Sequence, residues 1–114
     1  MSVELVLATP LLLLLLLVAV QSGVWWHATH IADTVAAHAL AAARVQDGTP
    51  AVGQQTGERV WAQLGTGVLQ QARIEVTRTA AGTRVEVRGL AEPVVPGLRL
   101  PVAATAVGTT EPPP

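Results

Sequence analysis

The stretch Leu5–Val24, LVLATPLLLLLLLVAVQSGV, constrains this chain more than any other feature. Twenty residues of α-helix rise about 30 Å, which is the thickness of a bilayer's hydrocarbon core. Nine Leu and four Val favour insertion, and they outweigh the moderate penalties of the few polar residues in the run. We therefore predict a transmembrane segment over residues 5–24, preceded by a short N-terminus of residues 1–4.

The remainder of the chain leaves room for one small domain. Residues 58–107 are predicted to form a small α+β extracytoplasmic domain, which buries little core by itself and should lean on the long helix or on neighbouring subunits. The net charge of −1 and the lack of a basic stripe give no reason to expect a nucleic-acid partner. The absence of cysteine excludes disulfides and thiolate metal sites.

The residue types that carry most enzyme chemistry are scarce. The chain has no Lys and no Tyr, and its serines are Ser2 and Ser22, both at the membrane segment. The globular part therefore lacks the usual nucleophiles and several general bases. We expect a protein that is not an enzyme, with no catalytic residue, no cofactor and no cofactor-binding residue.

A second helical stretch follows the apolar run directly. Trp25 and Trp26 are predicted to lie at the membrane interface, with their rings among the headgroups. Residues 25–46 keep the helical period, with an apolar stripe through Ala28, Ile31, Val35, Ala39 and Ala42. We predict one continuous helix from about Leu5 to Arg44, half in lipid and half amphipathic, closed by a left-handed residue at Asp47-Gly48.

Three histidines and an aspartate gather on the other side of this amphipathic half. His27, His30 and Asp33 recur every three residues, with His38 nearby, so two imidazoles could converge on a metal ion. No third strong ligand from a separate element and no HExxH pattern accompany them. A solvated polar face explains the same spacing, and we expect no metal site.

Beyond the helix, residues 47–57 (DGTPAVGQQTG) are predicted to be a linker, because they contain three glycines and a proline. A shorter helix is expected over residues 58–71, with Trp61 and Leu64 in the domain core.

Two alternating segments then predict a β-hairpin over residues 73–79 and 84–89. A turn centred on Ala81-Gly82 would place Val76 opposite Val87 and Glu75 opposite Arg88. The outward Arg, Glu and Thr side chains are expected to be solvated. The predicted core positions of this hairpin are Ile74, Val76, Val85 and Val87.

A third strand is predicted over residues 102–107, at the sheet edge because Pro101 cannot donate to a ladder. Residues 108–114 end in EPPP and are expected to be a disordered tail. The fold class is therefore α+β: a long N-terminal helix, a short helix and a small antiparallel three-stranded sheet.

Three stretches together resemble the TadE-like family, the minor pilin-like (pseudopilin) proteins of tight-adherence, Flp-type pilus systems, in an actinobacterial form. They are SVELVLATP before the leucines, the His- and Ala-rich stretch after the tryptophans, and the closing VPGLRLPVAATAVG. The resemblance implies a pilin-like fold and assembly by helix packing in the membrane. It implies as partners the lipid bilayer, other pilin-type subunits and tight-adherence membrane platform proteins.

The resemblance also implies a prepilin-type N-terminus. A short basic leader ending in Gly is removed by a prepilin peptidase on the cytoplasmic side, and Glu4 matches the glutamate at the fifth mature position. That carboxylate would compensate the N-terminal amine of a neighbouring subunit, since an isolated carboxylate in lipid is costly. Counting back from Glu4, the processing glycine falls before Met1. Three explanations are open: the reading frame begins further upstream with a basic stretch ending in Gly, the chain has been trimmed, or this member is not processed. We favour the first.

Other readings of the apolar run remain open. The chain could be a signal-anchored single-pass membrane protein with a small extracytoplasmic binding domain. A cleaved signal peptide would use Val20-Gln21-Ser22 as its cleavage site, although no basic residue precedes the run. A small metalloenzyme would use the three histidines. The pilin reading places the N-terminus in the cytoplasm and the C-terminal domain outside the cell membrane.

Overall fold

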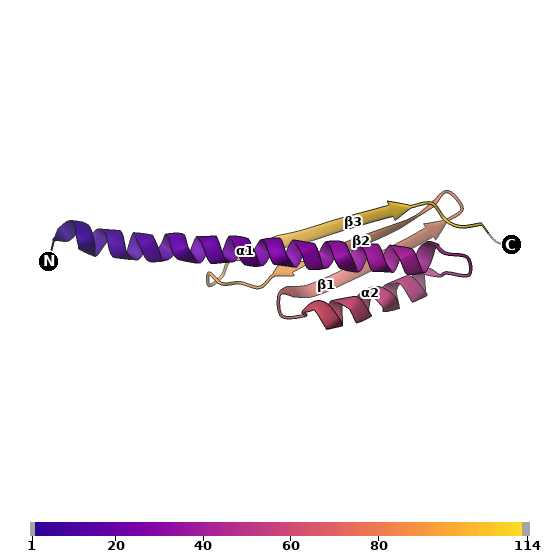
Figure 1. Cartoon of the computed structure of the whole chain (residues 1–114), viewed down its shortest axis with the longest axis horizontal. Helices are drawn as coiled ribbons and strands as arrows, with labels where there is room; N and C mark the ends of the chain where they lie inside the picture. The colour runs from indigo at the N-terminus through magenta and orange to yellow at the C-terminus, as the bar shows by residue number, and fades with distance from the viewer. Residues whose placement is uncertain (1, 113–114) are drawn as a thin grey trace.

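The computed structural model describes residues 2–112 and shows an α+β fold. Within this range the elements are, in order, α1 (Val3–Arg44), α2 (Pro50–Leu64), β1 (Leu69–Thr79), β2 (Gly82–Ala91) and β3 (Pro101–Gly108). The predicted fold class is confirmed. The molecule is an elongated rod of 78 × 22 × 17 Å, and α2 and the sheet gather around the C-terminal half of α1 (Figure 1).

α1 is one unbroken helix, as the sequence predicts. It begins after Ser2, whose hydroxyl oxygen accepts a hydrogen bond from the Leu5 amide at 3.4 Å. It ends at Arg44, and Asp47 adopts the predicted left-handed conformation with φ of 66°. Its buried residues all lie from position 21 onward: Gln21, Ala28, Ile31, Ala32, Val35, Ala36, Ala39 and Ala43.

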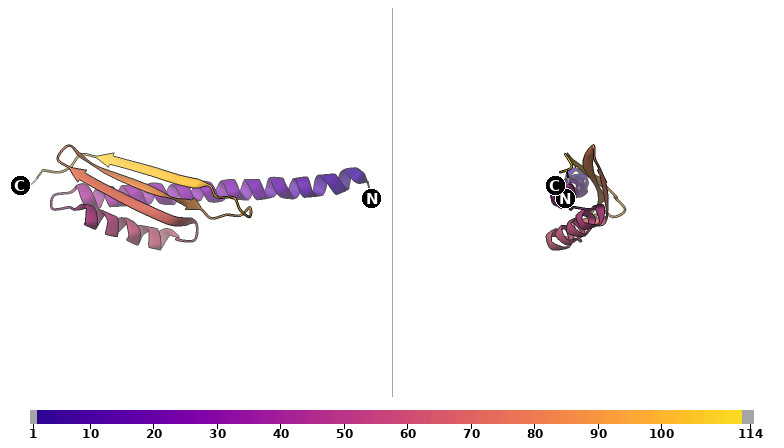
Figure 2. Two further views of the ribbon diagram at one scale, coloured as in Figure 1. Left: turned by 180° about the vertical axis from the view of Figure 1, so that it is seen from behind. Right: turned by 90° about the vertical axis from the view of Figure 1, so that its right-hand side faces the viewer.

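The buried stripe of α1 is made mostly of alanine, which lets the sheet approach the helix closely. Both helices lie on one face of the sheet (Figure 2). The predicted stripe is buried except at its last position, because Ala42 is partly exposed and Ala43 is fully buried. A step of four residues from Ala39 keeps the stripe facing the sheet, whereas the predicted step of three rotates it away.

The sheet has the order β1-β2-β3, and both pairings are antiparallel. The predicted third strand is confirmed as an edge strand that starts at Pro101. The predicted hairpin register is wrong by two residues, because the turn consists of Ala80 and Ala81, with Thr79 paired to Gly82. The Thr79 hydroxyl bonds to both the amide and the carbonyl of Gly82, which closes the turn one residue earlier than expected.

The shift changes the cross-strand partners but not the faces. Val76 lies opposite Val85, and Ile74 lies opposite Val87. A shift of two residues keeps every side chain on its predicted side of the sheet.

The second helix is α2, Pro50–Leu64, so the predicted linker 47–57 and the predicted helix over residues 58–71 are wrong at their boundaries. The Thr49 hydroxyl caps the helix by accepting from the Val52 amide at 3.1 Å. The glycines that suggested a linker are packing residues instead. Gly53 and Gly57 are buried, and a Cβ on Gly53 would lie 2.7 Å from the Cβ of Ala43 in α1.

The core lies between the second half of α1 and the inner face of the sheet. Among the residues predicted to be in the core, Val85 and Val87 are fully buried and Ile74 is 7% exposed. Trp61 and Val76 are partly buried at the margin of this cluster. Leu64 is 44% exposed, because α2 ends there and the chain turns towards β1.

The end of α1 is capped by Arg78, which the hairpin pattern places on the inner side of β1. Its Nη1 lies 2.5, 2.6 and 2.8 Å from the carbonyl oxygens of Ala43, Val45 and Gly48. Its guanidinium satisfies carbonyls that have no partner within the helix.

The segment predicted as a disordered tail is partly held in place. The Glu111 amide donates to the Arg44 carbonyl at 2.9 Å, and the Arg44 guanidinium donates back to the Thr109 carbonyl at 3.0 Å. The last two prolines of the predicted tail, residues 113–114, lie outside the described residues.

Candidate functional site

The N-terminal half of α1 makes no contact that would bury its side chains. Every Leu and Val from Val3 to Val20 is between 39% and 74% exposed. An apolar window within this helix has a mean hydropathy of 2.7, and none of it is buried. From Val3 to Val20 the helix rises about 27 Å, close to the hydrocarbon thickness of a bilayer. The helix is long and apolar enough to cross a membrane.

The hydroxyl groups of Thr9 and Ser22 are satisfied within the helix itself. The Thr9 hydroxyl donates to the Leu5 carbonyl at 2.9 Å, and the Ser22 hydroxyl donates to the Val18 carbonyl at 2.8 Å. Such bonds lower the cost of placing a hydroxyl in an apolar medium. Glu4 lies exposed in the first turn, where its carboxylate faces the positive end of the helix dipole.

We call the exposed part of α1, Val3–Val20, the free half, and the part of the chain packed around residues 21–44 the head. Gln21 lies where the free half meets the head. Its side chain is 2% exposed. Its amide oxygen accepts from the Val94 and Val95 amides at 2.7 and 3.2 Å, and its amide nitrogen donates to the Glu92 carbonyl at 3.1 Å. These three bonds fasten the β2–β3 loop to the helix.

Gln21 lies within the predicted transmembrane segment, and the sequence patterns did not predict its bonds to the loop. The available signal was a primary amide in an apolar run, because such a group needs partners if water is absent.

Trp25 and Trp26, the two predicted interfacial tryptophans, lie about one helical turn after Gln21 towards the C-terminus of α1. The Trp25 Nε1 donates to the Pro101 carbonyl at 3.1 Å, so its ring also holds the start of β3 against α1. Trp26 is 63% exposed and packs edge-on against His30, with 5.2 Å between the ring centroids. Both rings border an open groove of about 570 Å³ whose lining is mostly apolar: Ser22, Trp25, Trp26, Leu100 and Pro101.

Comparison with known protein families gives a match over α1. Residues 1–44 match the sequence model of the family described as TadE-like protein, and this range ends where α1 ends. This part of the chain is similar to that family, so the predicted resemblance is confirmed over the long helix. Comparisons with curated proteins and with solved structures gave no match.

The histidines of α1 lie on its exposed side. His27, His30 and His38 are exposed, as is Asp33. The His38 ring nitrogen Nδ1 lies 2.9 Å from the Thr34 carbonyl. Within residues 2–112, no group of three or more His, Cys, Asp or Glu side chains is arranged to hold a metal ion.

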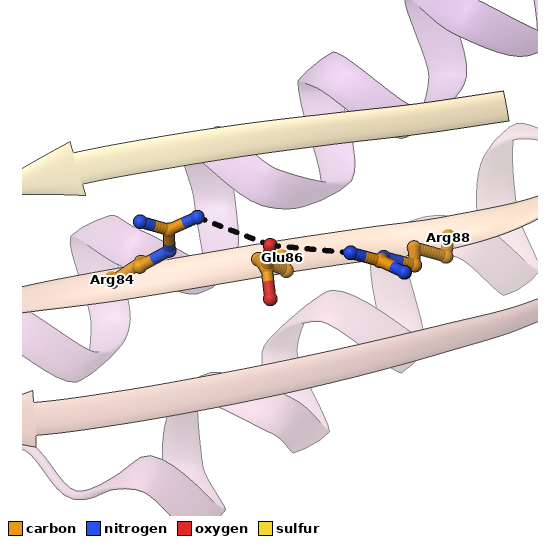
Figure 3. Close-up of polar contacts among 3 residues, drawn as sticks. All are labelled: Arg84, Glu86 and Arg88. Atoms are coloured by element: carbon orange, nitrogen blue, oxygen red, sulfur yellow. Dashed lines mark hydrogen bonds and ion pairs between the residues drawn. The ribbon is translucent and has the colours of Figure 1, made fainter.

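The outer face of the sheet is charged and is not covered by any described residue of the chain. Glu86 in the middle of β2 pairs with its neighbours along the strand, at 3.1 Å to Arg84 and 3.7 Å to Arg88 (Figure 3). The expected pair of Glu75 with Arg88 is wrong, because Glu75 lies opposite Glu86. The two arginines are more than half exposed, so each pair contributes at most about 1 kcal/mol.

Proposed function

We propose that this protein is a TadE-like minor pilin or assembly subunit of a tight-adherence pilus, and that it acts by packing its free helix against other pilin-type helices. The observation that carries the proposal is the division of α1 into two halves. The second half is the core of a folded head, whereas Val3–Val20 has no partner among the described residues. An apolar helix of this length needs lipid or other helices around it.

The position of Glu4 supports an assembly role rather than simple anchoring. Its carboxylate lies one turn from the end of the free half, where it can accept a bond from the N-terminal amine of an adjacent subunit. In this proposal the N-terminus faces the cytoplasm, a prepilin peptidase processes it, and the head lies outside the membrane. Lateral packing of free halves then brings subunits into register.

Crosslinking of single-cysteine variants tests the proposal, because the native chain has no cysteine that would interfere. Each leucine from Leu11 to Leu17 is replaced by Cys in turn, and the full-length protein is treated with a short thiol crosslinker in its native membrane. Helix packing predicts crosslinked products at positions that recur about every 3.6 residues. Ala62→Cys, on the exposed side of α2, is the matched control.

A signal-anchored protein that works as a single copy predicts a different pattern. Crosslinking at the leucines would then be absent, or equal at every position. The assembly proposal does not survive either result.

Replacement of Glu4 separates assembly from insertion. Glu4→Gln removes the carboxylate and is expected to reduce crosslinking at the leucines while the protein remains in the membrane fraction. Glu58→Gln removes another exposed carboxylate in α2 and serves as the control that should change neither property. Equal crosslinking in the Glu4 and Glu58 variants would exclude a role for Glu4 in assembly.

A further inference from the structure

We infer that the β2–β3 loop, residues 92–100, is a second membrane contact that lies in the lipid interface beside α1. This inference rests on the proposed function, because it takes the free half of α1 to lie in a bilayer. The loop is the part of the head closest to that half, at the end of the sheet facing the N-terminus (Figure 1). Gln21, one residue beyond the free half, holds the loop at this level by three hydrogen bonds.

The composition of the loop suits a lipid interface better than water. Its tip reads PVVPGL from residue 93 to residue 98 and contains no polar side chain. Leu98 is 37% exposed, and the exposed Trp26 lies at the neighbouring groove that Leu100 helps to line. Surface loops are ordinarily rich in polar residues, so an apolar tip beside an apolar helix forms a continuous surface for lipid.

The backbone of the tip is also adapted to a medium poor in water. Pro93 and Pro96 have no N–H group, and the amides of Val94 and Val95 donate to Gln21. The Leu98 amide donates to the Val95 carbonyl at 3.1 Å, closing a turn through Pro96 and Gly97. Gly97 has φ of 79°, as the third residue of a type II turn requires.

Few backbone donors of the tip therefore need water. In an interface where water is scarce, each unpaired amide would carry a free-energy cost, and this loop largely avoids that cost.

The charged side chains of the loop are also placed where lipid headgroups would lie. The loop has two charged residues, both exposed: Glu92 next to the end of β2, and Arg99 directly after the apolar tip. A guanidinium placed there can donate to lipid phosphates while its aliphatic stem stays among apolar groups. The partner of this surface is thus a bilayer surface, with phosphate headgroups around Arg99 and acyl chains near Leu98.

Lipid quenching of a fluorophore tests the inference on the full chain in lipid vesicles at a low protein-to-lipid ratio. A polarity-sensitive dye is attached to the single-cysteine variant Leu98→Cys, and the vesicles contain lipids spin-labelled at a shallow or a deep acyl position. The expected result is a blue-shifted emission that is quenched more by the shallow label. Leu14→Cys is expected to be quenched more by the deep label, and Thr105→Cys, exposed on the outer sheet face, by neither.

The three positions distinguish failure of the loop contact from failure of the proposed span. If Leu98→Cys behaves like Thr105→Cys while Leu14→Cys is quenched, the loop lies in water and the inference is overturned. If Leu14→Cys is also not quenched, the membrane span itself is wrong. If the dye at position 98 is protected from aqueous iodide only at high protein-to-lipid ratios, the loop contacts a neighbouring subunit, which also overturns the inference.

Two further variants test the parts of the contact. Gln21→Ala in the Leu98→Cys background should reduce shallow quenching, because the loop loses its attachment to α1, while Thr105→Cys stays unchanged. Arg99→Gln should abolish any increase in quenching when anionic lipid replaces zwitterionic lipid. An unchanged response to anionic lipid in Arg99→Gln would overturn the assignment of Arg99 to the headgroups.

Discussion

Because α2 packs closely against α1 at Gly53, we expect Gly53→Ala to lower the free energy of unfolding by an amount that can be worked out from the contacts. The added Cβ would lie 2.7 Å from the Cβ of Ala43 and 3.0 Å from the carbonyl oxygen of Ala39. Carbon atoms pack best at about 3.5–4.0 Å, so α2 must move outwards by roughly 1 Å. Overpacking of this kind costs about 1–3 kcal/mol, and the higher helix propensity of Ala offsets about 1 kcal/mol of it.

We therefore expect Gly53→Ala to lower the free energy of unfolding by about 1 kcal/mol. The full chain in detergent micelles would be unfolded by heat and followed by circular dichroism. A loss of 1 kcal/mol corresponds to a fall in Tm of about 4–8 °C for a domain of this size. Gly23→Ala is the matched control, because nothing lies within 4 Å of its added Cβ, and it should be neutral or stabilising.

A double variant tests whether the loss of stability comes from the contact between the Cβ atoms of residues 43 and 53. Ala43→Gly removes the opposing Cβ, so Gly53→Ala should cost less in that background than in the native chain. If Gly53→Ala raises Tm as Gly23→Ala does, or if its cost is the same in both backgrounds, the close contact between the helices does not exist.

Three further substitutions are expected to act at the two ends of the head. Arg78→Met should cost about 1.5–3 kcal/mol, because carbonyls at the end of α1 lose a charged donor, and thermal unfolding measures the loss. Gln21→Ala should cost about 1–3 kcal/mol and speed amide exchange at Val94 and Val95, whereas unchanged exchange would mean that Gln21 does not bond to these amides. Trp25→Phe keeps an aromatic ring but removes the N–H that donates to the Pro101 carbonyl, and it should cost about 0.5–1.5 kcal/mol by the same thermal assay. An unchanged Tm would mean that this hydrogen bond does not hold β3 against α1.

Sequence patterns predicted those parts of the fold that depend on hydrophobic period. The 3.6-residue stripe of α1 and the alternation in β1 and β2 identified the long helix and the faces of the sheet. Residue spacing alone did not determine the hairpin register, because Thr79 closes the turn with its own side chain and Gly82 belongs to β2.

The features that the sequence patterns did not predict depend on contacts between segments far apart in the chain. Gly53 and Gly57 have the composition of a linker, and only the alanine face of α1 shows why glycine is needed in α2. Gln21 and Arg78 are likewise explained by backbone groups about 70 and 30 residues away along the chain, which no local pattern reveals.

The most direct test of the account is the location of three single cysteines in intact cells, probed with a thiol reagent that does not cross membranes. We expect Thr105→Cys to react in intact cells and Ser2→Cys to react only after the membrane is permeabilised. Leu14→Cys should stay protected until detergent dissolves the membrane. Reaction of Leu14→Cys in intact cells, or of Ser2→Cys and Thr105→Cys from the same side, would contradict a helix whose first half spans the membrane and whose second half forms the core of an external head.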